Sequence, residues 1–218
     1  MKRILCCVVA FMLSFSFLNA KGDFVSQKRV FIIHGFDANP SKHWFGWLKS
    51  ELESKGVSVS VLDLPNSSDP KLEQWLGTIK NAVGKVDENT YFIGHSLGCI
   101  TTLRFIEGLD ESARVGGVLL VSGFYEPLAI LPQLDPFVAA PLKASKLEKI
   151  IAQRIVLSAK DDSIVPTSLS ENLAKKINAR FVQSPKGGHF MQDDGFKSLP
   201  IALKLIEEEL GASCCAVR

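Results

Sequence analysis

The sequence YFIGHSLGCI, residues Tyr91–Ile100, predicts a strand, a sharp turn and the start of a helix, with Ser96 at the apex of the turn. Gly94 and Gly98 flank the serine at two residues on either side, so strand and helix can approach without a Cβ clash. A serine hydroxyl acts as a nucleophile only when it is exposed, close to a base and close to donors that bind a developing oxyanion. The turn exposes the hydroxyl and places the Leu97 N–H as one such donor. The alternative interpretation is an ordinary glycine-rich turn in a parallel sheet.

Short apolar strands alternate with helices on both sides of this turn. Besides the strand before Ser96, we expect strands at Arg29–Ile33, Val57–Leu62, Gly117–Val121, Arg154–Ser158 and Ala179–Gln183. Helices are expected at Ser41–Lys55, from Asp69-Pro70 to Val83, and at Ile100–Glu107, Thr167–Ile177 and Phe196–Leu210. The alternation predicts an α/β fold with a mostly parallel sheet of about six strands and helices on both faces.

One stretch, Phe124–Leu142, interrupts the alternation and is called the proline-rich segment below. It carries four prolines among many apolar residues, which exclude a long regular helix. Its position after a strand, at the ligand-binding edge of the sheet, suits a small lid or the wall of an acyl pocket. An ordinary excursion packed on the surface is the other interpretation.

Composition and charge narrow the function classes. The 218 residues are 46% hydrophobic and 22% charged, as in a soluble globular protein. The net charge of +2 comes from Lys2 and Arg3, and a neutral body gives no electrostatic reason to expect nucleic-acid binding. No phosphate-binding loop, dinucleotide motif or metal-ligand cluster is present in the sequence, so we expect no cofactor and no metal.

The first twenty residues form a separate unit. A short basic start, an uncharged apolar run and Ala20 outline a secretory signal peptide over residues 1–20, with an uncleaved anchor as an alternative. The expected organisation is this leader followed by a single domain over residues 21–218 with a short disordered C-terminal tail. The expected location is secreted or periplasmic, or else cytoplasmic, with no stable membrane span in the mature form. Cys99 is expected to be a small buried side chain, and Cys214 and Cys215 to lie in the tail.

A nucleophilic Ser96 needs a base and an acid. Of the four histidines, His95 follows the strand directly and is expected to point away, whereas His189 lies in a flexible loop that can reach the turn. The acid should precede this histidine in the chain and follow a strand, which selects Asp162, with Asp161 as second choice. The alternative is that both aspartates cap the helix that begins at Thr167.

The oxyanion needs a second donor beside Leu97. The loop after the first strand, His34-Gly35-Phe36, stands where such a donor is expected, and we assign the N–H of Phe36, with that of Gly35 as second choice. His34 itself is expected to be structural, and His43 lies near a helix start.

Several motifs together resemble the small serine hydrolases of the retinoblastoma-binding protein 9 and YdeN type, in the α/β-hydrolase superfamily. They are Gly94-His95-Ser96-Leu97-Gly98, Trp44-Phe45-Gly46-Trp47-Leu48, Asp161-Asp162 with Val165-Pro166, and Gly188-His189-Phe190. The resemblance covers nearly everything from Arg29 to Leu210. It implies a Ser96, Asp162 and His189 triad in one compact domain with a reduced lid.

The expected activity is metal-independent hydrolysis of a small-molecule carboxylic ester through an acyl-enzyme. Amide hydrolysis and acyl transfer to an acceptor other than water use the same triad and stay open. A protein-binding module on the same fold is the alternative from another class, since protein-binding roles are associated with this family by name.

Overall fold

The computed structural model describes residues 27–215, with side chains described as far as Gly211. Its centre is a sheet of six strands in which every neighbouring pair is parallel. The strands are β1 (Arg29–Ile33), β2 (Ser58–Leu62), β3 (Thr90–His95), β4 (Val115–Val121), β5 (Ile151–Ala159) and β6 (Arg180–Ser184). The expected α/β fold with a parallel six-stranded sheet is confirmed.

The strand order is β2-β1-β3-β4-β5-β6. The chain adds β2 on one side of β1 and then adds β3 and the later strands on the other side. The two connections that leave β1 and β3 run to opposite sides, so a crevice opens beyond their carboxyl ends. Ligands of doubly wound sheets bind at this point. The loop after β1 and the turn after β3 therefore meet where the sequence predicted an oxyanion donor and a nucleophile.

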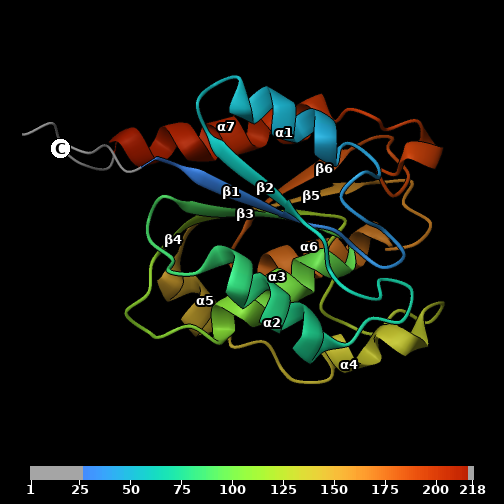
Figure 1. Ribbon diagram of the computed structural model, residues 1–218. Helices are drawn as coiled ribbons and strands as arrows, with labels where there is room; N and C mark the ends of the chain where they lie inside the picture. The colour runs from blue at the N-terminus through green and yellow to red at the C-terminus, as the bar shows by residue number, and fades with distance from the viewer. Residues whose placement is uncertain (1–26, 216–218) are drawn as a thin grey trace, which may run out of the picture.

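Helices cover both faces of the sheet (Figure 1). One face carries α1 and α7, and the other carries α2, α3, α5 and α6. Their bounds are α1 (Phe45–Glu53), α2 (Leu72–Val83), α3 (Leu97–Glu107), α5 (Ala144–Ile150), α6 (Thr167–Lys176) and α7 (Pro200–Cys215). Two apolar layers result, as expected for a sheet buried on both sides.

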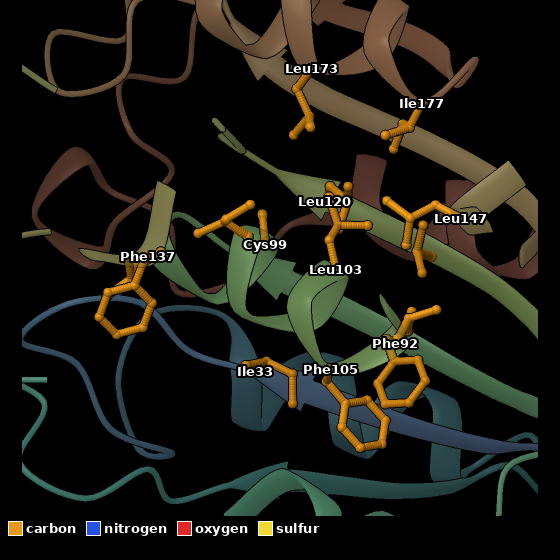
Figure 2. Packing of buried hydrophobic residues seen from close by; sticks show 14 of the residues in the cluster. Ile33, Phe92, Cys99, Leu103, Phe105, Leu120, Phe137, Leu147, Leu173 and Ile177 are labelled. Carbon is orange, nitrogen blue, oxygen red and sulfur yellow. The ribbon is translucent and has the colours of Figure 1, made fainter. Parts of the chain in front are cut away.

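The layer that contains α3 forms the larger part of the core. Figure 2 shows side chains of α3 between those of the sheet and those of neighbouring helices. Cys99 and Leu103 of α3 are fully buried in it, as is Phe92 of β3. Cys99 is a buried free thiol, as expected, and burial raises the pKa of the thiol well above its usual value. The helix that begins at the sharp turn is thus held firmly against the sheet.

The proline-rich segment folds into a 3-10 turn (Pro132–Leu134) and the short helix α4 (Asp135–Val138). Its far end is tied to α3 by a buried ion pair. The Arg104 guanidinium donates to Glu107 at 2.9 Å, to the Phe137 carbonyl at 3.1 Å and to the Ala140 carbonyl, while Glu107 accepts the N–H of Lys143. Both charges are buried and both have several partners, so the pair fixes the segment instead of leaving it as a free flap.

Helices α1, α7 and α5 depart furthest from the sequence expectation, whereas α2 and α3 begin within three residues of it. Helix α1 begins at Phe45 instead of Ser41, because His43 has a left-handed backbone with φ of 56°. Helix α7 begins at Pro200, where proline fits the first turn and its ring disfavours a helical residue before it. It continues through Cys215, so its last turn includes Cys214 and Cys215. Helix α5 was not expected from the sequence at all.

The proposed signal peptide, residues 1–20, lies outside the described residues. Among residues 27–215, none of the helices combines the length and apolar character that a bilayer span requires.

Candidate active site

Ser96 sits at the turn between β3 and α3 in a backbone conformation that side chains rarely adopt, with φ of 54° and ψ of −123°. Such strain costs roughly 1–3 kcal/mol and persists only where the surroundings impose it. Here the Ser96 N–H donates to the Val121 carbonyl of β4 at 2.9 Å, and α3 is packed tightly behind the turn. This is the geometry of a nucleophile elbow.

Glycines make the turn possible because neighbouring backbones occupy the space of a side chain. A Cβ on Gly98 would lie 2.2 Å from the Ile33 carbonyl oxygen, and one on Gly94 would lie 2.7 Å from the Cys99 Cα. A Cβ on Gly35 would lie 2.9 Å from the Ser96 Cβ and 3.5 Å from the Leu97 nitrogen. The loop after β1 therefore passes directly beside the serine and the first N–H of α3.

His189 follows β6 and is paired with Asp162, which follows β5. The His189 Nδ1 lies 2.9 Å from Asp162 Oδ2 and 3.1 Å from Oδ1, and both side chains are almost completely buried. Asp162 also accepts the N–H groups of Ile164 and Val165, each at 2.9 Å. A carboxylate held in this way keeps the proton of the imidazole on Nδ1 and leaves Nε2 as the basic nitrogen.

Asp161 holds the backbone of the same loop. It accepts the N–H of Gly187 at 2.8 Å and of Gly188 at 2.9 Å, and these hydrogen bonds, chiefly that of Gly188, lower the pKa of its carboxyl. Asp194 accepts the N–H of His189 at 3.0 Å. The expected alternative, in which the two aspartates cap the Thr167 helix, is wrong, because that helix has no side-chain cap.

A cavity of about 320 Å³ contains both Ser96 and His189 in its lining. Its apolar lining residues are Phe36, Ile130, Leu131, Ile164 and Met191, and its polar ones are Asp37, Lys42, His43, Gln192 and Asp193. The proline-rich segment supplies Ile130 and Leu131, so it forms part of the wall. Phe36, assigned from the sequence as an oxyanion donor, lies on the same cavity.

His43 and Gln192 were missed from the sequence as residues of this site. Two hydrogen bonds join them across 149 positions of the chain. The only local signal was the position of His43 directly before the aromatic start of α1. Burial, followed by the nearby His189, lowers the pKa of His43 to about 4.

The remaining histidines have structural contacts. His34 Nε2 accepts the N–H of Leu64 at 3.0 Å and is buried, as expected of a structural residue. His95 was expected to point away from the site; it is not part of the cavity lining, but it contacts the loop that carries His189. Its Nε2 lies 2.8 Å from the His189 carbonyl oxygen, and the two rings are 5.0 Å apart.

Comparisons with known proteins identify the family and the fold. Residues 30–208 match the serine hydrolase family. YdeN of Bacillus subtilis (strain 168) is 43% identical over 179 residues, which cover 82% of this chain and 94% of YdeN. The serine hydrolase RBBP9 of Rattus norvegicus is 22% identical over 169 residues, 77% of this chain and 88% of RBBP9.

The crystal structure of the B. subtilis ydeN gene product superposes with a TM-score of 0.83 at 42% identity, over 85% of this chain and 100% of that one. The fold is therefore that of the α/β hydrolases. With the family match over residues 30–208, this chain belongs to the serine hydrolase family.

Proposed function

We propose that this serine hydrolase uses Ser96, His189 and Asp162 as a catalytic triad and that it cleaves a carboxylic ester. The observation that carries the proposal is that Ser96 occupies an elbow on the same cavity as His189, whose Nδ1 is paired with Asp162 at 2.9 Å. The order of Ser96, Asp162 and His189 in the chain, which is typical of α/β hydrolases, supports the same assignment.

The mechanism follows from these positions. His189 Nε2 takes the Ser96 proton as Oγ attacks the carbonyl carbon, and the resulting oxyanion accepts hydrogen bonds from the N–H groups of Leu97 and Phe36. Asp162 stabilises the imidazolium. The protonated His189 then gives its proton to the departing alkoxide, which leaves as the alcohol. Water, deprotonated by the same imidazole, attacks the acyl-enzyme and releases the acid.

The apolar part of the lining supports an ester with a hydrocarbon arm. A second cavity of about 280 Å³ adjoins the first and shares Ile130 and Ile164 with it. It is lined largely by apolar residues, including Pro127, Leu128 and Leu169. Ile130 lines both cavities and is 62% exposed, so we take its side chain to stand at the boundary that an arm would cross from one cavity to the other.

The triad is tested by intact-mass analysis after exposure to a fluorophosphonate. We expect one adduct on the wild type, mapped to Ser96 by digestion, and none on Ser96→Ala. His189→Ala should label far more slowly. An unlabelled wild type, under conditions that label a control hydrolase, would contradict the proposal.

The ester assignment is tested with p-nitrophenyl esters of increasing acyl length and with the matching anilides. We expect turnover of the esters, and we expect Ile130→Trp to shift the preference toward shorter acyl chains because indole would block the passage. Leu109→Trp, at a partly buried position away from both cavities, serves as the control. Faster cleavage of the anilides would make the enzyme an amidase instead.

A further inference from the structure

His43 is fastened to the loop that carries His189. The N–H of His43 donates to Gln192 Oε1 at 3.2 Å, and the N–H of Gln192 donates to His43 Nδ1 at 3.1 Å. The backbone φ of His43 is 56°, a left-handed value that is uncommon for a residue other than glycine. The imidazole is therefore placed on the cavity wall by two loops at once, at some cost in backbone strain.

These contacts determine which ring nitrogen carries the proton. Because Nδ1 accepts a hydrogen bond, the neutral ring is protonated on Nε2. The pKa of about 4, lowered mainly by burial, keeps the ring neutral at physiological pH. His43 thus presents a single N–H donor.

That donor has no partner of its own. No described residue bonds to His43 Nε2, and this atom is not among the buried polar atoms that lack a partner, so it is accessible. His43 lines the cavity that contains Ser96 and His189, and we infer that its accessible Nε2 faces this cavity. Such a donor loses its water when a substrate fills the cavity, so ligands that supply a hydrogen-bond acceptor are favoured.

We propose that the Nε2–H of His43 binds a carbonyl oxygen of the substrate that lies away from the scissile ester. The inference rests on the proposed function and narrows its substrate class to esters with an apolar arm and a second carbonyl group. Ile130, Leu131 and Ile164 offer the apolar surface for that arm, while Lys42 and Gln192 lie with His43 among the polar lining residues.

The test uses pairs of esters in which a ketone oxygen replaces an isosteric methyl branch, placed once in the acyl arm and once in the alcohol arm. The ratio of kcat/KM within a pair is compared between proteins, so the intrinsic reactivity of each ester cancels. For one of the two arms, we expect the wild type to favour the ketone roughly three- to tenfold more than His43→Asn does, the range of one net hydrogen bond.

Asparagine is the informative replacement. Its side-chain oxygen can still accept the Gln192 N–H and it tolerates the left-handed backbone, but it has no donor at the Nε2 position. His43→Gln is the matched variant, because it keeps a donor at about that reach while losing the preferred backbone. We expect His43→Gln to retain part of the ketone preference and to be the less thermally stable of the two.

The outcomes separate the two proposals. Suppose that the wild type is labelled on Ser96 but that the wild type and His43→Asn show the same ketone preference. This result overturns the role of His43 and leaves the proposed hydrolase activity intact. A ratio that survives in His43→Asn but collapses in Lys42→Met would assign the donor to the Lys42 ammonium, which also overturns it. A wild type without any adduct on Ser96 removes both proposals.

Discussion

The buried ring of His95 donates a hydrogen bond from Nε2 to the carbonyl oxygen of His189 at 2.8 Å, since a carbonyl can only accept. Nδ1 of His95 is buried and has no partner in the described part of the chain. Burial, followed by the nearby His189, lowers the pKa of His95 well below its usual value, so the ring stays neutral. The residue before the proposed nucleophile thus contacts the backbone of the proposed base.

We expect His95→Phe to lower kcat about ten- to hundredfold with little change in KM, because His95 is not part of the cavity lining. His95→Gln, which restores a donor, should recover part of the loss. Steady-state kinetics of the three proteins check this. An equal loss in His95→Phe and His95→Gln would show that only the packing of the ring matters.

The adjacent carboxylates Asp161 and Asp162 should differ when each is changed to asparagine. Asp162→Asn removes the group that fixes the His189 tautomer, and in other serine hydrolases such a change costs about 10⁴-fold in kcat. Asp161→Asn should cost about tenfold and should increase hydrogen exchange at the Gly187 and Gly188 amides that Asp161 binds. Similar activities of the two variants, or exchange that is unchanged in Asp161→Asn, would contradict this division.

Alanine at Gly98 should destabilise the fold. The new Cβ would lie 2.2 Å from a backbone oxygen of β1, and relieving such overpacking costs about 3 kcal/mol. Gly77→Ala, in the exposed middle of α2 with nothing near the new methyl, should instead gain roughly 0.5–1 kcal/mol. Urea denaturation measures both, and a Gly98→Ala protein as stable as Gly77→Ala would show that β1 yields easily.

Glu209 should make stability depend on pH. Its carboxyl is buried against Gly117 with no partner among the described residues, and burial raises its pKa well above the usual value. The folded protein keeps a proton that the unfolded chain releases, so this contribution is full below the ordinary glutamate pKa and is lost as pH rises toward the raised value. The free energy of unfolding should therefore fall less for Glu209→Gln than for the wild type between about pH 4 and about pH 8. Urea denaturation at a series of pH values measures this.

Glu208→Gln is the control for Glu209. Glu208 is exposed and paired with Arg180 at 2.7 Å. The Glu208→Gln variant should therefore show nearly the same pH dependence of the free energy of unfolding as the wild type. Parallel pH curves for wild type and Glu209→Gln would mean that the carboxyl is ionised in the folded protein.

The parts of the structure that were predictable are those with local signals. The glycines around Ser96 predicted the sharp turn. The order of Ser96, Asp162 and His189 predicted that the three residues lie close together, because parallel strands bring their carboxyl ends to one edge of the sheet. The pairing of His43 with Gln192 was not, because it joins loops 149 positions apart. Helix α5 was missed because it is one short stretch of seven residues between a proline and a strand.

Asp161 and Asp162 lead to a last consequence for natural variation. They are identical neighbours in a surface turn, where gain or loss of a residue is usually tolerated. Here one carboxylate faces the imidazole and the other faces the loop amides, so neither can stand in for the other. Deleting a single codon would leave one of the two partners without its carboxylate, and in functional homologues the length of this turn should vary less than its exposure suggests.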